Sequence, residues 1–256
     1  MSPVAFITGA ASGIGAAAAR RLAAREYRTV LADIDPRGAE TAAEVGGRFT
    51  RLDVTDLDAN RACVADLLAT EGRLDVAFLN AGVTGPGDAL PLQHSDYRRI
   101  LGVNLDGVVF GIDACAAAMT DGGAIVATAS LAGLSPMPGD ALYTLTKTAV
   151  VGYVRALAPS LARHGITLNA LCPGFADTPL ITDMREHFTA GGFPLLTADD
   201  VVDALCTVLD GEDTGQAWFV QPGLPAAPFR FGNVPAARRP DGEHARVPTT
   251  LGGTHS

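Results

Sequence analysis

Charged side chains and aromatic rings are both scarce in this sequence of 256 residues. Asp, Glu, Lys and Arg make up 18% of it and Phe, Trp and Tyr 6%, whereas hydrophobic residues make up 48%. That balance is typical of a globular chain and excludes a disordered one. The formal net charge is −9. Because an acidic chain repels phosphate backbones, we expect no nucleic-acid partner. The length suits one large domain or two small ones.

Cysteine and histidine are also few. The four cysteines, Cys63, Cys115, Cys172 and Cys206, have no metal-ligand spacing and no neighbouring histidine, and the five histidines are scattered. We therefore predict reduced thiols and no metal site. The first residues lead straight into an apolar run without a charged segment and signal core, and no apolar run is expected to cross a bilayer. These features predict a cytoplasmic protein without a membrane partner.

What is present is a regular alternation of short apolar runs with longer helical patterns. Continuous apolar runs are typical of strands buried on both faces of a parallel sheet. The alternation predicts a doubly wound, Rossmann-type α/β fold with seven parallel strands and helices on both faces. The expected strands are 4–8, 29–33, 49–52, 75–80, 123–129, 166–171 and 216–221, and the expected helices are 14–25, 36–45, 56–71, 95–119, 140–163 and 198–210.

Capping residues support several of these helix starts. Asp35 precedes a proline, Asp56 and Ser95 can cap the next two helices, and Thr197 with Asp200 begins the last one. From about Pro222 the sequence becomes rich in Pro and Gly. We therefore predict a domain over 1–223 and a tail over 224–256, whose end is expected to be mobile.

A glycine-rich turn follows the first expected strand. It reads Thr8-Gly-Ala-Ala-Ser-Gly-Ile-Gly15 and opens an Ala-rich helix. Glycines there allow a tight turn and let the backbone approach a pyrophosphate, and the helix N-terminus adds free N–H groups and partial positive charge. A glycine pattern alone can mark an ordinary strand-to-helix turn. Its position after strand one favours dinucleotide binding.

Asp33 ends the second expected strand. A carboxylate there can accept hydrogen bonds from both ribose hydroxyls of NAD and would repel the additional phosphate of NADP. Arg37 lies close enough in sequence to bind the additional phosphate, so NADP stays an alternative cofactor. A plain turn residue, without a role in cofactor binding, is the alternative interpretation of Asp33.

Tyr143 and Lys147 are spaced i, i+4 in a long apolar helix, which puts both on one face. A nearby ammonium favours the phenolate and is expected to lower the pKa of a tyrosine from about 10 toward the range needed for proton transfer. By itself the pair is common on helix surfaces. Ser130 ends the fifth expected strand, however, and so belongs to the same sheet edge as the glycine turn.

Together these residues give the sequence a close resemblance to the short, single-domain branch of the short-chain dehydrogenase/reductase family. The resemblance covers residues 4–223. It is carried by Thr8, Gly9, Gly13 and Gly15, Asp53-Val54, Asn80-Ala-Gly82, Asn104, Ser130, Tyr143, Lys147, Pro173-Gly174 and Thr178. Leu79, where the family often has a second asparagine, and Gln221-Pro222-Gly223, where it often has Asp-Gly-Gly, depart from the pattern.

The resemblance implies a role for each of these residues. Tyr143 would be the acid/base, Lys147 would lower its pKa and bind the nicotinamide ribose, Ser130 would orient the substrate oxygen, and Asn104 would hold a water of a proton relay. The implied cofactor contacts are Gly9, Ser12, Gly13, Ile14, Gly15, Asp33, Ile34, Asp53, Val54, Asn80, Ala81, Gly82, Tyr143, Lys147, Pro173, Gly174, Phe175 and Thr178.

The segment between Thr178 and Thr197 covers the substrate in the family. Its apolar residues predict either a lid with a hinge at Gly191-Gly192 or an ordinary amphipathic helix; they are Leu180, Ile181, Met184, Phe188, Phe193 and Leu195. With Val83, Leu131, Leu134 and Met137 expected near the site, the sequence favours an apolar or ring-bearing alcohol.

Three functional hypotheses follow. The first is an oxidoreductase that moves a hydride between NAD(H) and a secondary alcohol or ketone. The second is an NADPH-dependent ketone or 3-ketoacyl reductase, and the third is a catalytically idle dinucleotide-binding protein. The resemblance also implies a homo-oligomer, a tetramer or dimer, built largely from the helices at 95–119 and 140–163. Phe229 and Phe231 are expected to pack on a neighbouring subunit or on the chain's own surface.

Overall fold

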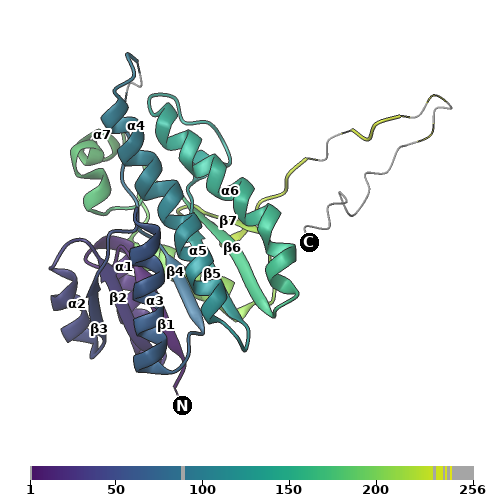
Figure 1. The fold of residues 1–256 in the computed structure, drawn as a ribbon. Helices are drawn as coiled ribbons and strands as arrows, with labels where there is room; N and C mark the ends of the chain where they lie inside the picture. The colour runs from purple at the N-terminus through teal and green to yellow at the C-terminus, as the bar shows by residue number, and fades with distance from the viewer. Residues whose placement is uncertain (1, 88–89, 233–234, 239, 241–242, 244–256) are drawn as a thin grey trace.

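A single eight-stranded sheet organises the computed structural model, which describes residues 2–87, 90–232, 235–238, 240 and 243 (Figure 1). The strand order is β3-β2-β1-β4-β5-β6-β7-β8. All neighbouring strands are parallel except the last pair, β7 and β8. The predicted seven parallel strands are therefore confirmed, and a short antiparallel strand is added at the edge. The end of the tail, for which the sequence predicts mobility, lies outside the described residues.

The seven predicted strands lie close to their predicted positions, and the central ones are apolar and buried from both faces, whereas the edge strands β3 and β8 are only partly buried. The eight strands are β1 (Val4–Thr8), β2 (Arg28–Asp33), β3 (Arg48–Arg51), β4 (Val76–Leu79), β5 (Gly123–Thr128), β6 (Ile166–Pro173), β7 (Ala217–Val220) and β8 (Ala227–Pro228). Every residue of β1 and β4 is buried. Alternate side chains consequently enter two separate cores, one on each face of the sheet.

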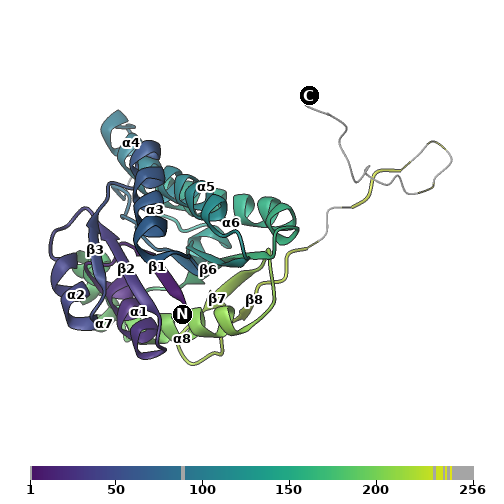
Figure 2. The same ribbon diagram turned by 60° about the horizontal axis from the view of Figure 1, so that its bottom comes forward.

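Helices cover both faces (Figure 2). α3 (Leu57–Glu71), α5 (Gly107–Ala118) and α6 (Ala141–Ala162) cover one face, where Phe6, Leu79 and Ile125 lie in the core. α1 (Gly13–Ala24), α2 (Gly38–Val45) and α8 (Ala198–Asp210) cover the other, where Ile7 and Phe78 are buried. The strand order reverses direction between β1 and β4, and at such a switch point open α/β sheets bind their ligands.

One predicted helix, 95–119, is three segments in the structure. α4 (His94–Leu101) continues through a π-helical turn, η1 (Gly102–Asp106), into α5. By length and composition the continuous helix His94–Ala118 is long enough to cross a membrane, which the sequence analysis did not expect. Ile100, Val108 and Ile112 are at most 2% exposed because the helix packs on the sheet and its neighbouring helices. We therefore interpret it as a core helix.

Local capping explains where the predicted helix starts were right and wrong. Asp56 accepts a hydrogen bond from Ala59 N, and Thr197 and Asp200 form a reciprocal capping box, as predicted. Ser95 does not cap α4, since Gln93 precedes its first residue. Asp35 forms a turn with Arg37 N, and α2 begins only at Gly38.

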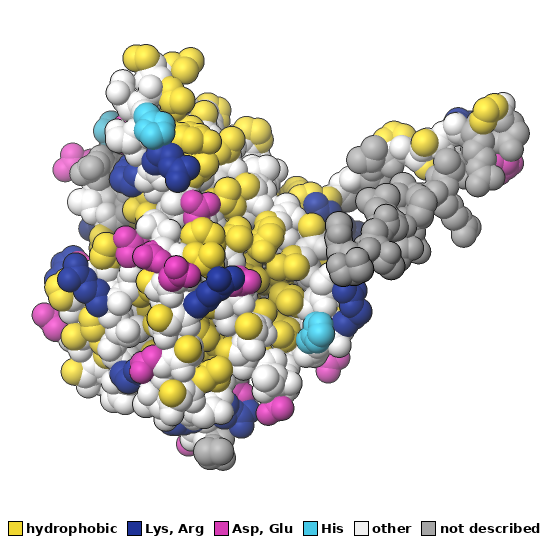
Figure 3. All heavy atoms as spheres, in the orientation of Figure 1, with side chains coloured by type: hydrophobic (Ala, Val, Ile, Leu, Met, Phe, Trp, Pro, Cys, Tyr) yellow, Lys and Arg dark blue, Asp and Glu magenta, His cyan; other side chains and the backbone are white. Residues whose placement is uncertain are grey.

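The chain beyond 223, predicted as a tail, contributes β8 and then crosses to α6. Phe229 and Phe231 stack edge to face with ring centroids 5.0 Å apart, and Phe231 lies 3.6 Å from the Arg155 guanidinium of α6. Phe231 thus packs on the chain's own surface, and packing of this segment on a neighbouring subunit stays a prediction. On this side of the molecule, apolar side chains remain visible at the surface over α5 and α6 (Figure 3).

Candidate active site

A cavity of about 1140 Å³ opens over the carboxyl ends of the strands. Of the residues that the resemblance assigns to the site, those lining it are Gly9, Ser12, Gly13, Ile14, Asp33, Ile34, Asp53, Val54, Asn80, Ala81, Gly82, Ser130, Tyr143, Lys147, Pro173, Gly174, Phe175 and Thr178. Gly15 and Asn104 are buried beneath it. The fold therefore brings residues from many separate segments to one place.

The glycine turn forms one end of the cavity. Gly9 has a φ of +65°, a conformation that glycine adopts without strain. A Cβ on Gly15 would collide with the carbonyl of Gly9. The turn and the start of α1 can therefore approach this closely only when residue 15 is a glycine. Ser12 is the N-cap of α1 but makes no side-chain cap hydrogen bond. The first N–H groups of the helix thus suit an anion such as a pyrophosphate.

Asp33 ties this turn to β2. Its Oδ2 accepts a hydrogen bond from Ala11 N at 2.9 Å, and its Oδ1 accepts one from Asp35 N at 2.9 Å. A carboxylate has about four acceptor positions, so lone pairs remain for two hydroxyl groups in the cavity. Arg37 pairs with Asp35, at 2.9 Å from Nε to Oδ2, and does not line the cavity.

Asn80 joins three strands beneath the cavity. Its backbone N–H donates to Thr8 Oγ1 at 3.0 Å, and its side-chain amide donates to the carbonyls of Thr8 and Gly9. Thr128 Oγ1 in turn donates to Asn80 Oδ1 at 3.2 Å. These contacts connect β1, β4 and β5 and hold the Asn80-Ala81-Gly82 segment in place.

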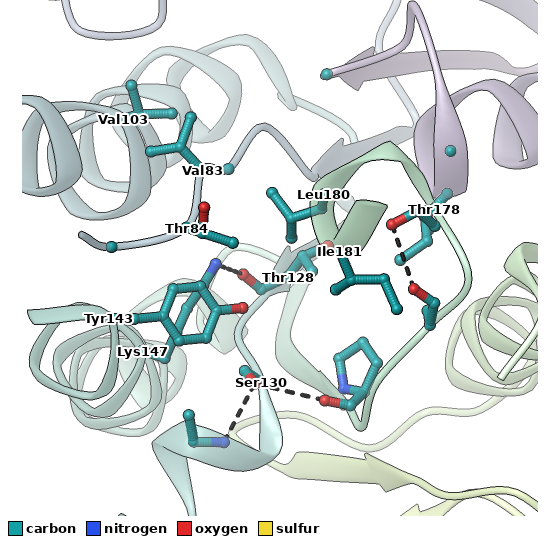
Figure 4. Close-up of a pocket in the computed structure, with 18 of the residues that line it drawn as sticks. Val83, Thr84, Val103, Thr128, Ser130, Tyr143, Lys147, Thr178, Leu180 and Ile181 are labelled. Atoms are coloured by element: carbon teal, nitrogen blue, oxygen red, sulfur yellow. Dashed lines mark hydrogen bonds between the residues drawn. The ribbon is translucent and has the colours of Figure 1, made fainter. Parts of the chain in front are cut away.

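Tyr143 and Lys147 lie on the same side of α6 and reach the cavity together (Figure 4). The Lys147 ammonium nitrogen is 5.5 Å from the centre of the Tyr143 ring. It donates a hydrogen bond to the carbonyl of Thr128 at 2.9 Å. Lys147 is 2% exposed and is the single lysine in the sequence.

Burial dominates the acid–base properties of this pair. Desolvation raises the pKa of Tyr143 above its usual value, and the nearby Asp140 carboxylate adds to the rise, while the Ser130 hydroxyl opposes it. Desolvation also lowers the pKa of Lys147 to about 8. The effect of Lys147 on Tyr143 stays a prediction, and in the chain by itself the pKa of Tyr143 is raised. The cause is that removing both groups from water disfavours both charged forms.

Ser130 begins the turn η2 (Leu131–Gly133) directly after β5. Its hydroxyl accepts a hydrogen bond from Ala132 N at 3.1 Å and lies 3.5 Å from the carbonyl of Pro173 on β6. The sheet register places β5 beside β6, so Ser130 and the Pro173-Gly174 segment meet at one edge. The Ser130 oxygen is consequently held near the Tyr143 phenol.

Asn104 lies in the π-helical turn η1 and is fully buried. Its Oδ1 accepts from Val83 N at 2.8 Å, and its Nδ2 donates to the Val83 carbonyl at 2.9 Å and to Thr146 Oγ1 at 3.3 Å. The π turn adds a residue to the helix and aims this amide at the loop. Asn104 therefore positions the loop after β4, and its part in a water relay stays a prediction.

An apolar wall closes the end of the cavity near Tyr143. Leu180 and Ile181 lie across the open space from Tyr143, and Val83 and Val103 lie above it (Figure 4). The segment after Thr178 forms η3 (Pro179–Met184) and α7 (Arg185–Ala190). Phe175, Phe188 and Phe193 cluster with ring centroids 4.3 to 5.9 Å apart. Of the predicted lid residues, Leu180, Ile181 and Phe188 line the cavity; the side chain of Met184 lies outside the described residues.

Several site residues were missed in the sequence analysis. Thr84, Gly85 and Asp140 line the cavity, and Thr128 holds Lys147. Asp140 had a detectable signal, because an acidic residue three positions before Tyr143 is a typical N-cap. Cys172 is buried beside Ser130 and Lys147, and burial raises its pKa to about 12, which keeps the thiol neutral.

Comparison with known proteins now adds to this geometry. A family model described as enoyl-(acyl carrier protein) reductase matches residues 9–193. The chain belongs to the short-chain dehydrogenase/reductase family. The match includes the glycine turn, Ser130, Tyr143 and Lys147, and so covers the residues that surround the cavity.

Individual relatives are similar over most of the chain. A 3beta-hydroxysteroid dehydrogenase of Mediterraneibacter gnavus is 40% identical over 68% of this chain and 66% of its own. The momilactone A synthase of Oryza sativa subsp. japonica is 35% identical over 90% of this chain and 92% of its own. The crystal structure of a 3-ketoacyl-(acyl-carrier-protein) reductase from Brucella melitensis, complexed with NADH, has a TM-score of 0.81 and 32% identity. It covers 86% of this chain and 97% of that one. This short-chain dehydrogenase/reductase is thus an oxidoreductase of alcohol and carbonyl groups.

Proposed function

We propose that this short-chain dehydrogenase/reductase is an NAD-dependent dehydrogenase of apolar, ring-bearing secondary alcohols. One observation carries the proposal: Ser130, Tyr143 and Lys147 face a single cavity that extends to the glycine turn and Asp33. A dinucleotide with its pyrophosphate at the start of α1 would place its adenosine ribose near Asp33 and its nicotinamide near Ser130, Tyr143 and Lys147.

The chain's own residues transfer the proton and position the substrate. The Ser130 hydroxyl holds the substrate oxygen, and the Tyr143 phenol exchanges a proton with it. Lys147 supplies positive charge beside the phenol. The bound cofactor supplies the hydride chemistry. Apolar side chains from η3 and the loop after β4 exclude water around the reacting carbon.

The preference for NAD over NADP rests on the charges around Asp33. The carboxylate would repel a 2′-phosphate, and Arg37, the cation that kept NADP open, is paired with Asp35. The solved relative carries NADH. Both arguments support NAD for this chain.

The substrate class rests on the wall near Tyr143. Val83, Leu131, Met137, Leu180 and Ile181 line this end. A ring or fused-ring alcohol would bury its apolar surface against this wall, whereas a small hydrophilic alcohol such as glycerol would leave the apolar side chains exposed to water. The steroid dehydrogenase among the relatives supports the same class.

The test is an absorbance assay of cofactor reduction over steroid, terpenoid, acyl and small hydrophilic alcohols, with NAD and NADP in parallel. We expect turnover with ring alcohols and NAD, and kcat/KM for glycerol lower by about 100-fold or more, as loss of apolar contacts predicts. Faster reaction with NADP, with ketoacyl substrates preferred in the reverse direction, would instead favour the reductase hypothesis.

Tyr143→Phe separates an enzyme from an idle binder. The variant keeps the ring but loses the proton that is exchanged, so we expect turnover to fall by about 100-fold or more while NADH binding is retained. Unchanged turnover would remove Tyr143 from the mechanism.

We also propose that the protein works in the cytoplasm as a homo-oligomer, and the four unpaired cysteines support a reducing compartment.

A further inference from the structure

Asp140 is a buried acidic residue that the reaction itself does not use. It lies at the N-terminus of the catalytic helix α6, is 8% exposed and lines the cavity. Its Oδ1 accepts a hydrogen bond from Tyr143 N at 3.0 Å, and its Oδ2 accepts one from Gly85 N at 2.9 Å. The carboxylate therefore links the helix that carries Tyr143 to the loop that forms the substrate wall.

The surrounding backbone keeps the carboxylate in this place. A Cβ on Gly85 would collide with Asp140 Oδ1, so the loop can approach this closely only with a glycine at that position. With two backbone donors fixing its two oxygens, the side chain has no freedom to turn away from an unfavourable ligand. The position of its negative charge is consequently set before any substrate enters.

No cation lines the cavity beside Asp140 among the described residues; Arg99, which donates to the Thr84 carbonyl at 3.2 Å in the adjoining loop, does not line it. Among the described residues that line the cavity, the charged ones are Asp33, Asp35, Asp53, Asp140 and Lys147. The first three lie at the ends of β2 and β3, on the far side of β1 and β4 from α6. Lys147 is buried behind Tyr143 against the Thr128 carbonyl. The wall around the reacting carbon is therefore apolar with one fixed anion.

The Asp140 charge is also within electrostatic reach of the reacting group, because it contributes to the raised pKa of Tyr143. A substrate oxygen bonded to Tyr143 would bring the rest of a small ring molecule into the same range. A carboxylate on that molecule would lie close to the Asp140 carboxylate in a partly desolvated site, where like charges repel appreciably.

We propose that Asp140 is a specificity-determining residue that selects uncharged alcohols and rejects substrates with a carboxylate near the reacting carbon. The inference rests on the proposed function and narrows its substrate class. Neutral ring alcohols fill the apolar wall without meeting an unpaired charge, whereas an anion would be placed beside a fixed carboxylate with no cation to pair with.

The experiment compares two probes that differ in charge and share one ring: 4-hydroxycyclohexanecarboxylate and its methyl ester. Both kcat/KM with NAD and dissociation constants by calorimetry in the presence of NADH are measured for the wild type, Asp140→Asn and Asp140→Ser. Asn and Ser are good N-cap residues, so α6 keeps its cap in both variants. Asp56→Asn, at the N-cap of α3 and outside the cavity, is the matched control.

We expect the wild type and Asp56→Asn to favour the ester, and the ester-to-acid ratio to fall by roughly tenfold in both Asp140 variants. A fall in both substrates with an unchanged ratio would show that Asp140 is structural only, and would overturn the proposal. So would a wild type that prefers the acid or binds neither probe. If no variant turns over but the ratio of dissociation constants shifts as expected, the proposed function fails and the charge selection stands.

Discussion

At the residue scale, Lys147 holds a proposed catalytic position in an environment that disfavours its charged form. Its side chain is buried at the cavity wall, and its ammonium donates a hydrogen bond to the Thr128 carbonyl. Burial lowers its pKa from 10.5 to about 8, a difference that corresponds to about 3 kcal/mol. The lysine on which the proposed mechanism depends is therefore expected to destabilise the fold around it, as functional residues often do.

The depressed pKa can be measured directly, because the chain has a single lysine. In protein labelled with ¹³C at the lysine Cε, we expect one side-chain signal that titrates near pH 8. Denatured protein is the control and should titrate near 10.5. A midpoint near 10.5 in the folded protein would show that the amine is well hydrated.

The same shift fixes how stability depends on pH. Below pH 8 the folded chain holds a charged, buried amine, and the penalty is complete. Between pH 8 and 10.5 the unfolded chain binds more protons than the folded one, so the penalty shrinks as pH rises.

Lys147→Met should therefore abolish turnover yet stabilise the fold by about 1 to 3 kcal/mol at pH 7. Denaturant unfolding of both proteins at several pH values measures the difference. We expect it to decrease from pH 8 to 10.5. A variant that is less stable at pH 7 would mean that the bond to Thr128 outweighs desolvation.

At the scale of elements, α8 shows how a few polar atoms fix where a helix begins. Asp200 N donates to Thr197 Oγ1 at 3.1 Å, and Thr197 N donates to Asp200 Oδ2 at 2.7 Å. Val201, Val202 and Leu205 then pack under the sheet at 0% exposure. The start of α8 thus sets which of its residues face the core.

Thr197→Ala should destabilise the protein by about 1 kcal/mol, because the first turn loses its side-chain acceptor. For a chain of this size that corresponds to a fall in Tm of about 2 to 4 °C by calorimetry. Ser95→Ala is the control, since Ser95 is exposed within α4 and caps nothing. Equal effects of the two substitutions would contradict the capping account.

The elements also show where sequence patterns stop being informative. Asp56 and Thr197 were identified as caps because their signals are local, whereas Ser95 failed because α4 begins one residue earlier, at His94. The π-helical turn at Asn104 has no periodic signal. It depends on the amide's contacts with Val83, a residue distant in sequence.

At the scale of the whole molecule, the α5–α6 face is the surface on which we propose self-association. Leu145 is 49% exposed there, and Phe110 and Tyr153 are half-buried. Apolar side chains extend across this face (Figure 3). A continuous apolar surface of this kind marks an interaction site in soluble proteins.

Gly152 on α6 offers a clean test of the interface. A Cβ there would meet nothing within 4 Å, so Gly152→Glu is accommodated by the single chain and favoured by helix propensity. In a helix-to-helix interface the same charge would be buried without a partner, so we expect a lower oligomer mass by light scattering. Ala69→Glu, at an exposed position of α3, is the control. Oligomers of unchanged mass would exclude this face.

The sequence by itself determined the parallel sheet, the glycine turn that opens α1 and the meeting of Ser130, Tyr143 and Lys147 at one cavity. Those features depend on local spacing: apolar runs that need two buried faces, glycines where backbones meet, and Tyr143 one helical turn from Lys147. Tertiary structure alone decided the environment of these groups. Burial raised the pKa of Tyr143, and the pairing of Asp140 with Gly85 joined segments 55 residues apart. Desolvation and long-range hydrogen bonds depend on which surfaces the fold encloses, and no local pattern encodes that.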